Sequence, residues 1–398
     1  MSSSLSTAAP SFDTDSLNSS WRRRDNVLPL PYEILSAIFS YVSHAHILHL
    51  RHLLFVCRSW SLVVLQEAEL WSSIQIDREL HQYFYASTLG GGVKEARATN
   101  FISLCISRSR SHPLSIILDF RSSMIWTRMR GYSINMDLFP LVKILVGSSG
   151  QHALRWHSLE WHSLVHLDRP SEIISILPHS LPQLKYLRLY QFQWDRQNEL
   201  KFPHCPNLEV VELHEHQEYE IQLFDKCDSS TVKELLVESR WVWHTADLLY
   251  IATFRNVLRL TLFSSHGGAL FELGAPEKIH LPQLKDLRLK GFIHPNLVGL
   301  LSAPSLNMVE FDHNGSITII LSHPVFTDIE TIAALIPPPS DVSFRVAVAA
   351  TLIHLVSSLR ALKLLRVKQW IYDIMKASDD PLGTSGILGH TIRLVIGD

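Results

Sequence analysis

From about residue 150 onward, the sequence repeats one pattern of three apolar residues. Two residues of any kind separate the first from the second, and one residue separates the second from the third. Leu184, Leu187 and Leu189 show it, and residues 281–289 repeat the segment 181–189 with one difference in nine positions. The last two apolar residues have the spacing of a strand, so their side chains point to the same side. We expect the first apolar residue to lie in the turn that enters the strand. The other copies begin at Trp156, Leu208, Val232, Val257, Leu306 and Leu359.

The spacing of these copies predicts a repeat architecture. Successive copies begin 22 to 28 residues apart, except for a last interval of 53 residues, which indicates a degenerate or replaced unit. A unit of ~20–29 residues has room for a strand and a return helix, and stacked units form a continuous core. Returns are expected at 171–177 and 247–254. A third is expected at 327–337, where Thr327 and Glu330 form a capping-box pattern.

Residues 28–76 have the different apolar spacing of short helices. Pro31 is expected at the start of the first, and Ser43 is expected to cap the second. Such a small three-helix bundle has little core of its own. The apolar positions of the three helices are Ile34, Leu35, Ile38, Phe39 and Val42, then Ile47, Leu50, Leu53 and Leu54, then Val56, Trp60, Val63 and Val64.

The remaining segments complete the predicted organisation. Residues 1–27 are rich in serine and poor in large apolar groups, so we expect them to be disordered. Residues 77–110 are expected to be a helical connector, and alternating apolar residues at 114–120 predict a strand. The repeat domain is expected to span 111–375, and 376–398 to form a tail.

Composition and charge narrow the classes of partner. With 46% hydrophobic and 19% charged residues, most of the chain can fold, and a net charge of −2 argues against nucleic acid. No apolar run approaches the ~20 residues of a membrane span, and none follows Met1 as in a secretory signal. The four cysteines are too scattered for a disulfide framework. We expect a cytoplasmic or nuclear protein that binds neither nucleic acid nor membranes.

The sequence lacks the common motifs of catalysis and cofactor binding. The chain has no nucleophile elbow, dinucleotide fingerprint, phosphate loop or zinc-protease motif, so no enzyme activity and no cofactor are expected. A hidden hydrolase or transferase would require clustered acid and base groups. The histidines at 44, 46, 49 and 52 suggest a metal site, but no cysteine or carboxylate completes one.

Three blocks in residues 28–76 resemble the F-box family: Leu30-Pro31 with Glu33, then Val56-Cys57-Arg58-Ser59-Trp60, then Leu70-Trp71. The resemblance implies docking on the Skp-type adaptor of a cullin-based ubiquitin ligase. An apolar helical module too small to cover its own surface is suited to such a role. The residues could instead be core of the module. The expected docking residues are Leu30, Pro31, Ile34, Leu35, Ile38, Val56, Cys57 and Trp60.

The repeat region resembles the irregular leucine-rich repeats that often follow F-boxes. The implied fold is α/β, a three-helix F-box followed by a horseshoe of strand and helix units. The regular repeat has asparagine three residues after the last strand leucine, and here only Asn314 fits. The concave face would then bind an unknown protein substrate, unless it is an ordinary solvated face. Its expected contacts are Glu160, Arg188, Tyr190, Glu212, His214, Glu238, Phe263, Arg288, Lys290, Glu310 and Asp312.

The implied function is that of a substrate-recognition adaptor of a Skp–cullin–F-box ubiquitin ligase. The chain would hold a substrate near the transferred ubiquitin, so its contribution is proximity and requires no catalytic residue. The alternative is an F-box and leucine-rich-repeat scaffold in a complex that contains no cullin. The sequence does not separate these two.

Overall fold

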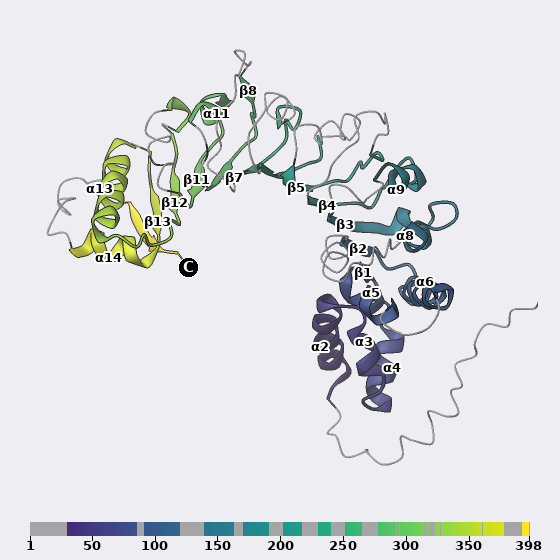
Figure 1. The fold of residues 1–398 in the computed structure, drawn as a ribbon. Helices are drawn as coiled ribbons and strands as arrows, with labels where there is room; N and C mark the ends of the chain where they lie inside the picture. The colour runs from purple at the N-terminus through teal and green to yellow at the C-terminus, as the bar shows by residue number, and fades with distance from the viewer. Residues whose placement is uncertain are drawn as a thin grey trace, which may run out of the picture.

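The chain folds as a helical module followed by a long parallel sheet, seen in a computed structural model (Figure 1). The strands follow one another along an arc, with the module at one end and the last helices at the other. The segment 1–27, expected to be disordered, lies outside the described residues. These are 30–85, 91–119, 139–162, 170–190, 202–216, 230–239, 251–264, 278–291, 293, 295–313, 317, 323–326, 328–359, 361–377 and 392–397.

The helical module contains α2 (Tyr32–Ala45), α3 (His49–Leu54), α4 (Arg58–Gln66) and the short η1 (Glu69–Trp71). Pro31 precedes α2, and its carbonyl accepts hydrogen bonds from the backbone N–H groups of Ile34 and Leu35, both at 3.1 Å. The expected cap at Ser43 is wrong. The Ser43 hydroxyl donates to the Ser40 carbonyl at 2.9 Å, because α2 continues past this point to Ala45.

Aromatic side chains hold the module together and attach it to the sheet. The rings of Phe39 and Trp60 meet edge to face at 5.0 Å between centroids, which packs α2 against α4. Trp71 is buried, and its indole N–H donates to the Val64 carbonyl at 2.7 Å. The chain enters the first strand directly after Trp71, so the module and the sheet share one continuous core.

Within the described residues, the main sheet has twelve strands in chain order, apart from β8 and β10, and every neighbouring pair is parallel. A short parallel pair, β8 (Ile279–His280) and β10 (Leu301–Ser302), lies beside it. The main strands are β1 (Ser73–Ile76), β2 (Leu114–Asp119), β3 (Trp156–His162), β4 (Tyr186–Tyr190), β5 (Val210–His216), β6 (Glu234–Ser239), β7 (Arg259–Ser264), β9 (Asp286–Gly291), β11 (Met308–Phe311), β12 (Thr331–Ala334), β13 (Leu364–Val367) and β14 (Arg393–Ile396).

The apolar pattern predicts these strands well where it is regular. Leu187 and Leu189 on β4 are buried and pair with Val211 and Leu213 on β5, so successive units stack their apolar residues in rows. The alternation at 114–118 is likewise buried on β2. The sheet also extends beyond the expected repeat segment 111–375, because β1 precedes it and β14 follows it.

Two expectations in the last part of the sheet are wrong. Residues 331–334 form β12, not part of a helix over 327–337, and Ile329, Ile332 and Ala334 supply its buried pattern. The last unit is also displaced by three residues, because Leu362, Leu365 and Val367 are the buried set. The unit that contains β12 therefore fills the long interval, which the sequence spacing gives as 53 residues.

Helices and turns connect the strands. The return expected at 171–177 is α9 (Pro170–Ile176), whereas the first half of the one expected at 247–254, residues 247–250, lies outside the described residues. Asp341 caps α13 (Val342–Ser358) by accepting the Ser343 N–H at 2.8 Å. The other helices are α5 (Arg78–Tyr85), α6 (Gly91–Arg108), α8 (Phe139–Val146), α11 (Pro295–Gly299) and α14 (Gln369–Ala377), with short turns η2 (Ala153–Arg155) and η4 (Pro324–Phe326).

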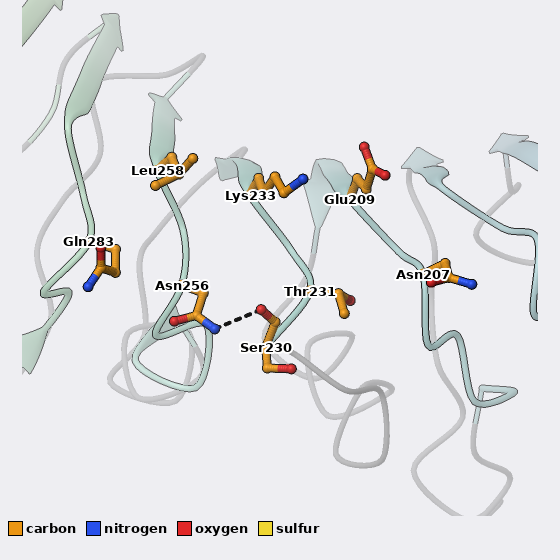
Figure 2. A pocket seen from close by; sticks show the side chains of 8 residues that line it. All are labelled: Asn207, Glu209, Ser230, Thr231, Lys233, Asn256, Leu258 and Gln283. Carbon is orange, nitrogen blue, oxygen red and sulfur yellow. Dashed lines mark hydrogen bonds between the residues drawn. The ribbon is translucent and has the colours of Figure 1, made fainter.

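Polar side chains link neighbouring units at the turns that enter the strands. The amide of Asn207 donates to the Pro182 carbonyl at 2.8 Å. The amide of Asn256 donates to the Ser230 carbonyl, also at 2.8 Å (Figure 2). Ser305 donates in the same way to the Pro282 carbonyl at 2.7 Å. These bonds lie at the end of the strands opposite to the asparagine ladder of regular repeats. We name Asn207, Asn256 and Ser305 the entry ladder.

Candidate protein-interaction surfaces

Helix α2 has two apolar faces. Leu35 is 3% exposed and Phe39 is buried with it, so this face forms the core of the module. Ile34, Ile38 and Tyr41 follow at helical spacing on another face and are 49%, 44% and 82% exposed. We name these three residues the outer stripe. A row of large apolar side chains in water is characteristic of a partner-binding surface.

Further large apolar side chains of the module are exposed. Those outside the outer stripe are Leu30, Tyr32, Phe55, Val56 and Leu62. Of the eight expected docking residues, Leu30, Pro31, Ile34, Ile38 and Val56 are exposed, and Cys57 and Trp60 are half-buried. Leu35 is core, so it supports α2 from beneath instead of presenting a surface contact. The sequence pattern alone did not indicate Tyr41, which continues the stripe one turn further.

The start of α2 is attached to the end of α4 by one side-chain hydrogen bond. The Tyr32 hydroxyl donates to the Glu67 carboxylate, and this bond raises the pKa of the tyrosine. The exposed residues at the start of α2 are therefore held at a defined position relative to α4. Such preorganisation reduces the entropy that association costs.

His46 connects the module to the helix that follows the first strand. Its ring is buried, and Nδ1 accepts the Leu48 N–H at 3.1 Å, so Nε2 carries the proton and donates to Asp77 at 3.0 Å. Asp77 also accepts the Leu80 N–H at 3.0 Å. Burial acts to raise the pKa of Asp77, but these hydrogen bonds outweigh it and lower the pKa. His46 thus has a structural partner on each nitrogen.

The outward face of the sheet carries ion pairs that cross the strands. Arg188 on β4 lies between two carboxylates, with Nε 2.9 Å from Glu212 on β5 and Nη1 3.6 Å from Glu160 on β3. Arg259 on β7 is flanked in the same way by Glu234 at 2.7 Å and Asp286 at 3.5 Å. Each arginine therefore bridges three successive strands.

A stack of three rings lies beside the first of these ion-pair groups. Tyr190 is stacked between His162 at 4.0 Å and His214 at 4.2 Å, with the three residues on β3, β4 and β5. His162 Nε2 contacts Glu160 at 2.5 Å. This hydrogen bond is the largest cause of a lowered pKa of Glu160, with the nearby Arg188 contributing.

His214 lies between two carboxylates. Nδ1 is 2.8 Å from Glu238 on β6, and Nε2 is 3.3 Å from Glu212 on its own strand. Burial alone would lower the pKa of His214, but its hydrogen bonds to the two carboxylates outweigh burial and raise it. The hydrogen bond between His214 and Glu212 is also the largest cause of the lowered pKa of Glu212.

The expected substrate contacts all lie on strands or at their ends, at positions that face away from the core. Arg188 is exposed, whereas Glu238 is only 8% exposed, and the others are intermediate. Arg288 lies 3.6 Å from Glu310. Asp312 accepts the backbone N–H of Gly291 at 2.7 Å, where φ is 67° and a Cβ atom would lie 2.1 Å from the Ser264 carbonyl.

The strand-entry edge carries a shallow hollow of about 470 Å³ (Figure 2). Asn207, Glu209, Thr231, Lys233 and Asn256 are among the residues that line it. The two asparagine amides are already bound to neighbouring carbonyls. The sequence reasoning missed this edge, although a polar residue just before the first apolar position of successive units was a visible signal.

Comparison with protein families identifies the helical module. Residues 28–77 match the F-box-like family model. F-box modules are protein-interaction adaptors, generally for Skp-type proteins, and are typically not enzymes. The matched segment contains α2, α3, α4, the short η1 and β1, and the outer stripe lies within it. A search of curated proteins finds no match to the chain.

No group of three or more histidine, cysteine or acidic side chains in the described part of the chain is arranged to hold a metal ion. Among the same residues, no helix combines the length and hydropathy needed to cross a bilayer.

Proposed function

We propose that this chain is the substrate-recognition subunit of a Skp–cullin–F-box ubiquitin ligase. The F-box-like module binds the Skp-type adaptor, and the sheet binds a protein substrate in the cytoplasm or nucleus. The observation that carries the first half is the outer stripe of Ile34, Ile38 and Tyr41, which the module leaves in water. Burial in a partner stabilises such side chains by roughly 1.5–3 kcal/mol each, before association costs.

The stacked sheet supports the second half of the proposal. Its strands run in chain order, all parallel, and repeat a buried apolar pattern, as expected for a leucine-rich-repeat horseshoe. The hydrogen bond of His46 to Asp77 and the buried core that runs from the module into the sheet support a scaffold that holds a substrate near the ligase. Catalysis then requires only proximity from this chain.

Co-purification tests the proposal directly. Tagged full-length chain is expected to retain both the Skp-type adaptor and a cullin, and Ile38→Asp with Tyr41→Asp is expected to lose both. Each substitution should weaken adaptor binding at least about tenfold, because it places a charge in an apolar contact. Leu154→Asp is the matched control, since Leu154 is also exposed and apolar but lies outside the module.

The outcomes separate the alternatives. Undiminished adaptor binding by the double variant contradicts docking through the outer stripe. Adaptor binding by the wild-type chain without any cullin points to the F-box scaffold in a non-ligase complex. Circular dichroism of each variant establishes that the sheet remains folded, which is expected because neither residue is buried.

A further inference from the structure

Strand β14 has a sheet neighbour on one side only. It pairs with β13, and the described part of the chain provides no strand on its other side. The backbone N–H groups of Arg393 and Gly397 donate to the Lys363 and Val367 carbonyls of the β13 side at 2.8 and 2.9 Å. Because alternate residues of a strand direct their backbone groups to opposite sides, those of Leu394 and Ile396 point away from β13. Unpaired groups of this kind are a template for a further strand.

The apolar row of the sheet is also uncovered at β14. Leu394 and Ile396 are in register with Leu365 and Val367, so they continue the row that forms the core. Leu365 and Val367 are buried, whereas Leu394 is 39% and Ile396 is 46% exposed. Each unit of a repeat array buries this row against the next unit. An added strand that brings apolar side chains would therefore complete the row.

The outward face near this edge carries unpaired positive charge. Farther along the sheet, Arg188, Arg259 and Arg288 each lie within 3.6 Å of a carboxylate. Arg366 on β13 and Arg393 on β14 are exposed, and neither has an ion-pair partner in the described part of the chain. The outward positions of β12 to β14 contain no acid, since they are Thr331, Ala333, Leu364, Arg366, Arg393 and Val395.

The two arginines lie close to the open edge. Arg393 is in register with Leu364, and Arg366 with Val395, so the arginines are diagonal neighbours on adjacent strands. A Cβ atom at Gly397 would lie 2.8 Å from both Cγ and Cδ of Arg366, which shows that the Arg366 side chain leans across β14. Two cations so placed repel each other, and an acidic side chain from a partner would relieve that repulsion.

We propose, building on the function proposed above, that β14 binds an extended segment of the protein substrate as an additional strand. The outward backbone groups of Leu394 and Ile396 pair with the segment, as in other cases of strand addition. Side chains of a strand alternate between its faces, so acidic ones meet Arg366 and Arg393 while apolar ones cover the exposed row. The edge therefore selects a segment that alternates acidic and apolar residues, and it repels a basic one.

Fluorescence anisotropy with the full-length chain tests this inference. The first probe is a fluorescein-labelled peptide of alternating glutamate and valine. The second replaces each glutamate by lysine, and the third has the composition of the first with its glutamates and valines in two blocks. We expect only the alternating glutamate peptide to bind. Equal affinity for the lysine peptide would overturn the role of the arginines, and equal affinity for the block peptide would overturn strand addition.

Variants of the chain locate the binding site. Arg366→Gln with Arg393→Gln should weaken binding of the alternating glutamate peptide by about tenfold, because two ion pairs are lost. Arg97→Gln with Arg255→Gln is the matched control, since it removes the same charge at two exposed arginines away from β14. The control should leave the affinity unchanged. Equal weakening by both pairs would mean that only the net charge of the chain matters, which overturns the inference.

Methylation of the peptide backbone tests the pairing itself. Only alternate residues of an added strand direct their N–H groups to β14. Of two alternating glutamate peptides, one methylated on the valine nitrogens and the other on the glutamate nitrogens, one should therefore lose at least about tenfold in affinity more than the other. Equal affinities for the two would contradict strand addition.

Other occupants of the edge have distinct outcomes. Analytical ultracentrifugation is expected to show that the chain does not associate with itself through β14. A dimer that Leu394→Asp converts to a monomer would mean that a second copy occupies the edge, and it would overturn the inference. A monomer that does not bind the alternating glutamate peptide would overturn it too.

Adaptor co-purification with the same proteins separates the two proposals. The Arg366→Gln with Arg393→Gln variant should retain the Skp-type adaptor, since these residues lie on the sheet and not in the helical module. Peptide binding without any adaptor binding by the wild-type chain would contradict the ligase function and leave the strand-addition site standing. Adaptor binding with no peptide binding would contradict only the site.

Discussion

Nδ1 of His214 lies 2.8 Å from a carboxylate oxygen of Glu238 on the neighbouring strand. The other ring nitrogen faces Glu212 at 3.3 Å. A neutral imidazole has only one N–H, so it can satisfy only one of these carboxylates, whereas the imidazolium ion satisfies both. The arrangement therefore favours protonated His214, and it joins β5 to β6 at the centre of the proposed substrate face.

The first prediction is that His214 stabilises the fold in a pH-dependent manner. Its folded-state pKa is raised above the ordinary value of 6.5, so its contribution is present below that value and is lost as pH rises through the raised pKa. The pKa of Glu212 is lowered from its ordinary value of 4.5, so the contribution of its ionised form is present above that value and is lost as pH falls through the lowered folded pKa. Compared with His214→Gln, the wild-type chain should gain more stability near pH 6 than near pH 9.

Urea unfolding of the two proteins across this pH range measures the difference. Glu238→Gln serves as the control, because it removes one of the two carboxylates and should reduce the pH dependence. Parallel stability profiles for the wild-type chain and His214→Gln would contradict the coupling of the histidine to its carboxylates.

The second prediction separates two neighbouring residues of α2. Leu35 is buried and Ile34 is half exposed, although both fit the same helical pattern. Leu35→Ala should lower the free energy of unfolding of the module by roughly 2–4 kcal/mol, because it leaves a cavity. Ile34→Ala should lower it by less than about 0.5 kcal/mol while still weakening adaptor binding. Denaturant unfolding and adaptor titration give the two quantities, and similar stability losses would contradict the assignment of the two faces.

These two residues also mark a limit of sequence reasoning. The spacing of Ile34, Leu35 and Ile38 establishes an amphipathic helix, but the module is apolar on more than one side. Which side is core depends on the position of α4, where Trp60 packs against Phe39. That is tertiary information which the period of one helix does not contain.

The sheet was predictable wherever its units kept large apolar residues. The unit of Ile329, Ile332 and Ala334 was missed because its last position is alanine and because Thr327 and Glu330 mimic a helix start. The outward face was predictable from strand alternation. Its ion-pair groups were not, because the pairing of Arg188 with both neighbours depends on the register between strands.

The third prediction concerns the entry ladder. Asn256→Ala should destabilise the chain by about 1 kcal/mol, because it leaves the Ser230 carbonyl without its side-chain donor. Asn207→Ala should have a similar effect, and the two effects should add, since they act on different pairs of units. Gln283→Ala is the control, because no hydrogen bond of its side chain is seen in the described part of the chain. Chemical denaturation measures all three, and an equal loss for Gln283→Ala would contradict a specific role for the ladder.

The last prediction concerns the connection between the module and the sheet. His46 donates to Asp77, and both are also bound to backbone N–H groups, so the pair fixes the turn before α3 to the start of α5. A double-mutant cycle of His46→Ala and Asp77→Ala should give a coupling free energy of roughly 1.5–3 kcal/mol, as for a hydrogen bond to a charged group. Because the pKa of Asp77 is lowered below its ordinary value of 3.8, the stability gained from its ionised form should be present above that value. It should be lost as pH falls through the folded pKa. A coupling near zero would mean that the module and the sheet are joined by apolar packing alone. A coupling that persists unchanged below the folded pKa of Asp77 would contradict its dependence on the ionised carboxylate.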